Sequence, residues 1–314
     1  MAIRTLRSTM PRRPLTLFAP AKINWFLEVL GKRPDGFHEL VTFMSQVSLW
    51  DGLVFDMNSE GQIDLNIDDP TLDAGESNLV LKAARALAAH SGRNPGVHIT
   101  LYKRIPREAG LGGGSSDAAA TLTGLNRFWD LGYSREQLVE LASQLGSDVA
   151  FFLGGPSALC FGRGEKCQDR PAPQKHWLVM VQPNFGLATG AVYGTLRLTG
   201  VVQKVDPFLL AWQEGSSESV GREIFNRLEV PALNLQPQVA FWKRKLKEAG
   251  AMASLMTGSG SVIFGLYASA AEACRGANRI AKSAPFRGFD CDPSRTMGNE
   301  SELRIVRVVH TLTS

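Results

Sequence analysis

Short apolar stretches, separated by turns rich in Gly, Asp, Asn and Pro, fill the chain up to residue 67. They lie at 15–19, 23–30, 41–49, 53–57 and 62–67. A later stretch alternates apolar Val97, Ile99 and Leu101 with polar neighbours, as a half-buried strand does. The first part of the chain is therefore predicted to be rich in strands.

Helical patterns begin later and alternate only loosely with strands. Helices are predicted at 78–90, 115–129 and 134–145, and a Pro-rich, charged stretch follows at 170–175. Beyond it we predict a strand at 177–182, a helix at 189–197, a poorly patterned segment at 200–220, a helix at 237–249, strands on either side of 257–261, a helix at 269–282 and a strand at 303–309. Because strict strand-helix alternation is absent, the predicted fold class is α+β. The Pro-rich stretch would divide a domain of residues 1–170 from one of residues 171–314.

Residues 106–117, called the glycine loop below, read Pro-Arg-Glu-Ala-Gly-Leu-Gly-Gly-Gly-Ser-Ser-Asp. They stand between a predicted strand and an alanine-rich helix, which we expect Ser115, Ser116 and Asp117 to cap. Backbone N–H groups of such a loop and helix start attract a phosphate. The loop lacks the Lys of a Walker A sequence and the third glycine of a dinucleotide fingerprint. A flexible turn without a ligand is the simpler alternative.

Composition excludes several classes of protein. The chain has 44% hydrophobic and 20% charged residues and a net charge of +4, without a basic cluster interleaved with aromatics that would indicate nucleic acid. It has no apolar run long enough for a membrane span. We therefore expect a cytoplasmic protein that binds neither nucleic acid nor membrane. Residues 1–14 carry four arginines and no acid, which fits a frayed basic tail or a short organellar signal.

The four cysteines follow no metal-binding or disulfide pattern. They lack CxxC spacing and paired histidines, so we expect reduced thiols; they are Cys160, Cys167, Cys274 and Cys291.

Three segments together resemble the GHMP small-molecule kinases. They are Ala-Pro-Ala-Lys-Ile-Asn at 19–24, the glycine loop, and Thr-Gly-Ser-Gly-Ser at 257–261. The turn Arg-Pro-Asp-Gly-Phe-His at 33–38 and the segment Gly-Ser-Asp-Val-Ala-Phe-Phe at 146–152 are similar to the members that act in the non-mevalonate isoprenoid pathway. The resemblance covers residues 15–310 and thins in 196–235 and 284–302.

The resemblance implies a two-domain kinase with its active site in the interdomain cleft. ATP would phosphorylate the 2-hydroxyl of a methylerythritol group that carries cytidine diphosphate, giving the 2-phosphate and ADP. Mg²⁺ is implied with ATP, but its ligands stay unassigned. We expect a monomer or a weak homodimer.

The resemblance also assigns residues to ATP. Asn78 would lie near the base, or be an ordinary helix N-cap. The loop residues that would hold the triphosphate are Pro106, Gly110, Leu111, Gly112, Gly113, Gly114, Ser115 and Ser116.

Lys22 and Asp148 match the catalytic positions of these kinases. Phosphoryl transfer needs positive charge beside the γ-phosphate and a base for the attacking hydroxyl. Outside their motifs, Lys22 would be an ordinary surface lysine and Asp148 a helix cap.

The residues assigned to the acceptor are Asn24, Phe37, His38, Thr189, Tyr193, Gly258 and Ser259. His38 matches a histidine that binds cytosine, and Tyr193 falls where a second aromatic is supplied, although it could serve helix packing instead. Phe37 and Met44 depart from the family, which has Tyr at the first position and an aromatic at the second.

Other functions remain as alternatives. A GHMP kinase for mevalonate, homoserine or a sugar is disfavoured by the Asp-Gly-Phe-His turn, since those acceptors contain no pyrimidine. A non-catalytic nucleotide-binding relative is disfavoured by the presence of both Lys22 and Asp148. A dinucleotide-dependent oxidoreductase fits neither the glycine pattern nor its place in the chain.

Overall fold

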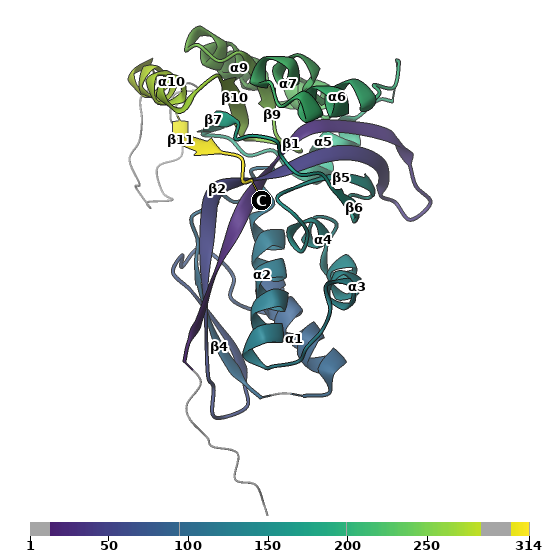
Figure 1. Ribbon diagram of the computed structural model, residues 1–314, viewed down its shortest axis with the longest axis vertical. Helices are drawn as coiled ribbons and strands as arrows, with labels where there is room; N and C mark the ends of the chain where they lie inside the picture. The colour runs from purple at the N-terminus through teal and green to yellow at the C-terminus, as the bar shows by residue number, and fades with distance from the viewer. Residues whose placement is uncertain (1–12, 94, 199, 284–302, 314) are drawn as a thin grey trace, which may run out of the picture.

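The computed structural model describes residues 13–93, 95–198, 200–283 and 303–313 (Figure 1). These residues form a seven-stranded sheet, a four-stranded sheet and helices packed against each. The predicted α+β class is confirmed. Residues 1–12 of the predicted basic tail lie outside the described ranges.

Two long antiparallel strands, β1 (Leu15–Lys32) and β2 (His38–Asp56), pair with each other in the larger sheet. The sequence indicated two short strands in place of each, because Pro20 and the Asp51-Gly52 pair look like turns. The structure instead shifts the register between Pro20 and Ala21. A bulge of this kind accommodates a residue that has no N–H to donate, so the strand continues.

The larger sheet has the order β3-β4-β2-β1-β8, with β5 paired to β2 and β6 to β5. Its remaining strands are β3 (Ile63–Ile67), β4 (Val97–Tyr102), β5 (Ser157–Gly162), β6 (Lys166–Asp169) and β8 (Phe225–Asn226). β8 comes from the second half of the chain and pairs in parallel with β1. The two halves of the chain therefore share this sheet.

Helices α1 (Leu79–Ser91), α2 (Gly113–Phe128), α3 (Arg135–Leu145) and α4 (Val149–Phe152) lie together beside the lower part of β1, β2 and β4 (Figure 1). Leu87, Leu122 and Leu125 from the helices pack with Leu53 and Phe55 of β2. The predicted helices at 78–90, 115–129 and 134–145 are confirmed to within two residues at each end.

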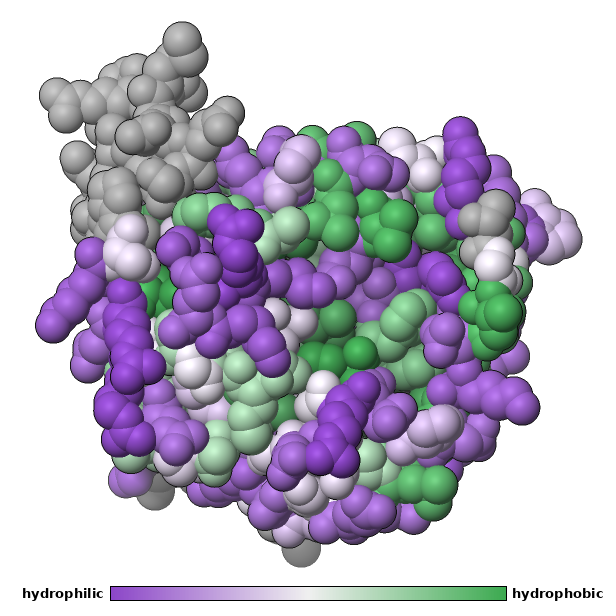
Figure 2. Space-filling model, turned by 90° about the horizontal axis from the view of Figure 1, so that it is seen from above, coloured by the Kyte–Doolittle hydropathy of each residue, from purple (hydrophilic) through white to green (hydrophobic). Residues whose placement is uncertain are grey.

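The smaller sheet has the order β11 (Leu303–His310), β7 (Trp177–Pro183), β10 (Ile263–Tyr267) and β9 (Ala253–Met256). Its helices are α5 (Thr189–Thr195), α6 (Asp206–Glu214), α7 (Ser217–Glu223), α8 (Glu229–Leu235), α9 (Gln238–Glu248) and α10 (Ala270–Ser283). Seen from above, hydrophilic residues surround several separate hydrophobic areas on this part of the molecule (Figure 2).

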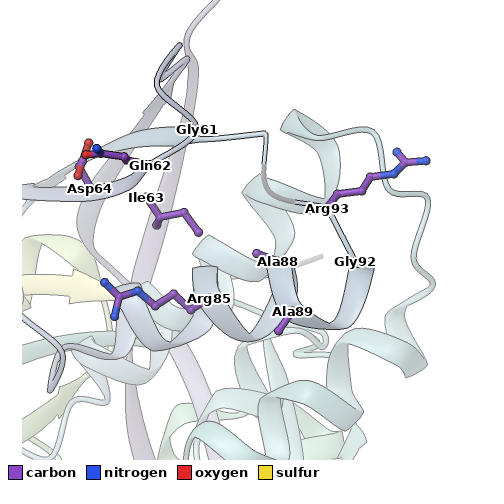
Figure 3. A pocket seen from close by; sticks show the side chains of 9 residues that line it. All are labelled: Gly61, Gln62, Ile63, Asp64, Arg85, Ala88, Ala89, Gly92 and Arg93. Carbon is purple, nitrogen blue, oxygen red and sulfur yellow. The ribbon is translucent and has the colours of Figure 1, made fainter.

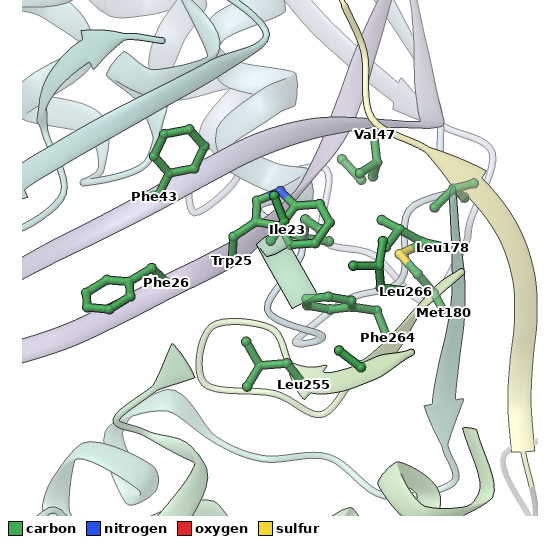
Figure 4. Packing of buried hydrophobic residues seen from close by; sticks show 14 of the residues in the cluster. Ile23, Trp25, Phe26, Phe43, Val47, Leu178, Met180, Leu255, Phe264 and Leu266 are labelled. Carbon is green, nitrogen blue, oxygen red and sulfur yellow. The ribbon is translucent and has the colours of Figure 1, made fainter. Parts of the chain in front are cut away.

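Aromatic side chains form the core where the sheets meet. Trp25 and Phe43 of the hairpin pack with Leu178 and Phe264 of the smaller sheet (Figure 4). The ring centroids of Trp25 and Phe264 are 5.4 Å apart. Residues from both sides of residue 170 share this cluster, and the division into domains 1–170 and 171–314 stays a prediction.

Cys160 and Cys167 form a disulfide between β5 and β6. The two residues stand directly opposite each other in the antiparallel pair, which brings their side chains together. The expectation of reduced thiols is thus wrong for this pair, because only the hairpin creates their proximity. Cys274 is free and exposed, and Cys291 lies outside the described residues.

Within the described ranges, every helix is too short or too polar to cross a membrane.

Candidate active site

A groove of about 1380 Å³ contains nearly all the residues predicted for the site. It is lined from the first half of the chain by Lys22, Asn24, Phe37, His38, Asn78, Pro106, Gly110, Leu111, Gly112, Gly113, Gly114, Ser115 and Asp148. From the second half it is lined by Thr189, Tyr193, Gly258 and Ser259. Segments that are far apart in the chain are thus brought to one place.

Ser116 is the exception among the predicted residues. Its side chain is buried behind the glycine loop, and its hydroxyl has no hydrogen-bond partner among the described residues. Met44 is likewise buried, in a cluster with Phe151, so the aromatic that the family has there would lie in the core.

Lys22 and Asp148 face each other in the groove. The Nζ atom of Lys22 lies 3.4 Å from Oδ2 of Asp148, and the lysine side chain is 4% exposed against 33% for the aspartate. Asp148 precedes α4 without making a capping hydrogen bond, so its carboxylate is not occupied by the helix start. A buried ammonium and a partly exposed carboxylate therefore meet at the groove surface.

Asn24 lies two residues after Lys22, and alternation along β1 places both on one face of the strand. Lys22 Nζ donates to Asn24 Oδ1 at 2.6 Å, and Asn24 Nδ2 donates to Thr42 Oγ1 at 2.8 Å. These bonds hold the lysine in one position on the sheet.

The outer edge of β1 holds the two glycine-containing turns. The N–H of Lys22 donates to Leu111 O at 2.9 Å, and the N–H of Asn24 donates to Thr257 Oγ1 at 3.0 Å. A Cβ atom on Gly110 would lie 2.1 Å from Thr257 O, so only glycine allows the glycine loop to contact the 257–261 turn this closely. The two turns are therefore packed backbone to backbone.

Helix α2 begins at Gly113, with Gly112 in the left-handed region as its N-cap. Ser115, Ser116 and Asp117 thus lie inside the helix, and the prediction that they cap it is wrong. Ser116 N is already paired with Gly112 O. The N–H groups of residues 113–115 precede this first helical bond and are free to bind an anion at the groove.

Asn78 is the N-cap of α1, as one of the two predictions had it. Its Oδ1 accepts from Val80 N at 2.9 Å, and its Nδ2 donates to Asp73 O at 2.9 Å. It also lines the groove, so the cap places it at the groove wall.

Aromatic rings also line the groove. His38 and Tyr193 have ring centroids 4.7 Å apart with an angle of 31° between their planes. Burial, with a further contribution from Lys32, lowers the pKa of His38. Burial and the nearby Asp148 raise the pKa of Tyr193. At neutral pH both shifts favour the neutral form of the side chain.

Phe37 is half exposed and lies under a cation that the sequence did not indicate. The guanidinium carbon of Arg163 lies 4.7 Å from the centre of the Phe37 ring. Across the groove, Thr189 and Ser259 share a hydrogen bond of 2.8 Å between their hydroxyls. Arg163 sits in a short β5–β6 turn with no motif around it, so only the fold places it here.

A second pocket of about 700 Å³ lies between β3 and α1 (Figure 3). Its residues are Gly61, Gln62, Ile63, Asp64, Arg85, Ala88, Ala89, Gly92 and Arg93. None of the residues predicted for the site lies there.

Comparisons with known families match both halves of the chain. Residues 78–156 match the GHMP kinases N terminal domain, and residues 209–284 match the GHMP kinases C terminal domain. A homoserine kinase from Cytophaga hutchinsonii has a similar fold, with a TM-score of 0.72 at 18% identity over 99% of this chain and 97% of the other.

More similar relatives share one description. A 4-diphosphocytidyl-2-C-methyl-D-erythritol kinase from Pelotomaculum thermopropionicum is 44% identical over 81% of this chain and 89% of its own. One from Bacillus cereus is 40% identical over 80% of this chain and 88% of its own. A crystal structure of 4-(cytidine 5'-diphospho)-2C-methyl-D-erythritol kinase matches with a TM-score of 0.72 and 36% identity, over 84% of this chain and 94% of the other. With both GHMP kinase domains matched and this level of identity to whole relatives, the chain belongs to the 4-diphosphocytidyl-2-C-methyl-D-erythritol kinase family of the GHMP kinases.

Proposed function

We propose that this protein transfers the γ-phosphoryl group of ATP to the 2-hydroxyl of 4-diphosphocytidyl-2-C-methyl-D-erythritol, giving the 2-phosphate and ADP in the non-mevalonate isoprenoid pathway. The observation that carries the proposal is the contact between Lys22 and Asp148 beside the glycine loop. One groove thus contains the cation of Lys22, the carboxylate of Asp148 and the helix start that can bind an anion.

Asp148 is the proposed base. Its carboxylate accepts the proton of the 2-hydroxyl while that oxygen forms a bond to the γ-phosphorus and the bond from the γ-phosphorus to the bridging oxygen of ADP breaks. Lys22 supplies positive charge to the phosphoryl oxygens as the transfer proceeds. Its position is fixed by Asn24, so little reorganisation is needed during the reaction.

The glycine loop is the proposed triphosphate site. The free N–H groups at the start of α2 point toward the anion, and the positive end of the helix dipole adds to their attraction. Asn78 and Pro106 would line the part of the groove that takes the base. Ser116 can contribute only through the helix dipole, since its N–H is paired with Gly112 O and its side chain is buried.

Mg²⁺ would be held mostly by the triphosphate. No cluster of three or more His, Cys, Asp or Glu side chains suited to a metal is present in the described ranges. Magnesium that serves ATP keeps several waters and needs only one or two protein oxygens, which fits this groove. When bound, it neutralises charge on the phosphates.

Phe37, His38 and Tyr193 are the proposed cytosine site. The 4.7 Å between the His38 and Tyr193 rings leaves no space for a third ring between them. A cytosine placed between the two rings would therefore require the His38 ring to move aside. Asn24, Thr189, Gly258 and Ser259 line the same groove and would contact the rest of the acceptor.

The test is ADP formation with 4-diphosphocytidyl-2-C-methyl-D-erythritol beside mevalonate, homoserine and galactose as acceptors. The proposal expects turnover with the first compound only. Turnover restricted to one of the other three would replace it with a different GHMP kinase activity, and ATP binding without turnover would indicate a non-catalytic relative.

A further inference from the structure

Three ionisable side chains meet beside the glycine loop, and two of them, Lys103 and Asp117, line the groove. They are Asp51 of β2, Lys103 just after β4, and Asp117 of α2, and they are called the ion cluster below. Lys103 Nζ contacts Asp51 Oδ2 and donates to Asp117 Oδ2 at 2.7 Å. The side chains of Asp51, Lys103 and Asp117 are 0%, 10% and 4% exposed. None of them has a part in the chemistry proposed above.

Asp51 holds the segment that leads into the glycine loop. Its Oδ2 takes the ammonium of Lys103, and its Oδ1 accepts from the backbone N–H groups of Arg104 and Ile105, the second at 2.8 Å. Three consecutive residues are thus attached to one buried carboxylate. The next residue is Pro106, where the loop begins.

Lys103 joins this segment to the far end of the loop. Asp117 is the last residue of the glycine loop and already lies within α2. A Cβ on Gly113, the first residue of that helix, would be 3.4 Å from Lys103 Nζ, and Lys103 also lines the groove. Both ends of the loop are therefore fixed to the same ammonium.

We propose that the ion cluster, with Asp51 as its anchor, positions the glycine loop for ATP. This inference rests on the proposed role of the loop as the triphosphate site. A loop that is fixed at both ends needs less ordering when ATP binds, so the cluster should act on ATP affinity more than on the acceptor or on the transfer itself.

The hydrogen bonds of the two carboxylates differ in a way that can be tested. Both oxygens of Asp51 accept from N–H donors, so an asparagine there would bring its NH₂ group against another donor. In Asp117 only Oδ2 accepts, and Oδ1 is buried without a partner among the described residues. An asparagine at 117 can keep the bond from Lys103 and place its NH₂ where no donor stands.

The pKa of Asp117 also indicates that Asp117 tolerates the loss of its charge. Burial raises the pKa of Asp117 to about 7, against the opposing effect of Lys103, with Asp51 adding to the rise. A neutral side chain at this position is therefore compatible with the cluster. The identical Asp-to-Asn change should have opposite outcomes at the two sites.

The experiment compares full-length Asp51→Asn and Asp117→Asn. Binding of a non-hydrolysable ATP analogue is titrated, and KM for ATP and for the acceptor is measured. We expect Asp51→Asn to weaken ATP binding roughly tenfold or more, the effect of about one unsatisfied buried donor. The acceptor KM should change less than about twofold, and Asp117→Asn should retain nearly the parent ATP affinity.

Glu28→Gln is the matched control for the loss of a buried ion pair, since Glu28 is 1% exposed and bonded to Arg227 on the same sheet. It should lower the melting temperature and leave ATP affinity unchanged. Should Asp51→Asn fail to fold, Asp51→Ser makes the same test, because it removes the carboxylate without bringing an NH₂ group against the donors of this segment.

Two results would overturn the inference: a folded Asp51→Asn variant with parent ATP affinity, or equal losses in Asp51→Asn and Asp117→Asn. Gly113→Val separates this failure from failure of the loop assignment. If Gly113→Val weakens ATP binding while Asp51→Asn does not, the loop remains the triphosphate site and only the positioning role is lost.

Discussion

Asp148 keeps a third of its side chain exposed beside an almost fully buried Lys22. Changing Asp148 to Asn preserves the shape and removes the proton acceptor, so the variant should fold normally and lose about 10²-fold to 10⁴-fold in turnover. Steady-state kinetics with a thermal melt measures both. Asp169→Asn, which alters an exposed pair with Arg135, is the control and should keep its turnover. An unchanged rate in Asp148→Asn would remove this residue from the mechanism.

Lys22 is the cation of the pair with Asp148, and its role can be tested separately. If its charge acts mainly as the phosphoryl group transfers, Lys22→Met should lower kcat much more than it weakens ATP binding. Turnover is compared with the affinity for an ATP analogue in the same preparation. Equal losses in both would instead make Lys22 a contact to the bound phosphate.

Residues within short motifs could be predicted from the sequence, and isolated residues could not. Lys22, Asn24 and Asp148 were predicted because each belongs to a short motif, and all three line the groove. Asp51 and Lys103 were not, since they are isolated in the sequence and only the pairing of β2 with β4 brings them together. Ser116 was expected to face the ligand, but the helix starts two residues earlier than predicted and turns it inward.

Among the elements, periodic helices were predictable and short ones were not. α6 and the first part of α7 fall in the segment at 200–220, and each helix has only about two turns, which is too brief for a clear period. β1 and β2 were predicted in pieces, because Pro20 and Gly52 resemble turns when the partner strand is unknown. In both cases tertiary packing decides what local sequence leaves open.

The glycine loop and the 257–261 turn pack closely against each other. A methyl group on Gly110 would collide with Thr257 O, and its positive φ already disfavours a side chain. Gly110→Ala should therefore push the turns apart and weaken ATP and acceptor together. Gly186→Ala, where nothing lies within 4 Å, is the control. Isothermal titration measures the affinity of each variant for ATP and for the acceptor. A folded Gly110→Ala variant with both affinities unchanged would contradict the close packing of the two turns.

For the molecule as a whole, the buried His176 should make the folded state less stable at acidic pH. His176 lies against Trp25 and Trp212 in the core between the sheets, with ring centroids 5.5 Å and 5.1 Å away, and burial lowers its pKa to about 4. The unfolded chain, with a histidine pKa of about 6.5, then binds more protons than the folded one between these values. This histidine should therefore leave the free energy of unfolding unchanged above pH 6.5. As the pH drops toward 4, it should lower that free energy by up to roughly 3 kcal/mol.

His176→Phe removes the titrating group while keeping an aromatic ring in the same space. Urea unfolding at a series of pH values should show a flatter acid limb for this variant than for the parent. His98→Asn, at an exposed histidine, should leave the limb as it is. A parent-like slope in His176→Phe would assign the acid sensitivity elsewhere.

The outer edge of β1 has a consequence for how the protein is made. Lys22 and Asn24 are synthesised long before Thr257, yet the N–H of Asn24 bonds to Thr257, 233 positions later in the chain. The glycine loop likewise needs that turn as its neighbour. Because a ribosome releases the chain from its N-terminus onward, the groove can be completed only after residues 257–261 have emerged. A truncated product that stops before β9 would carry the lysine, the base and the loop, and still have no finished site for ATP to enter.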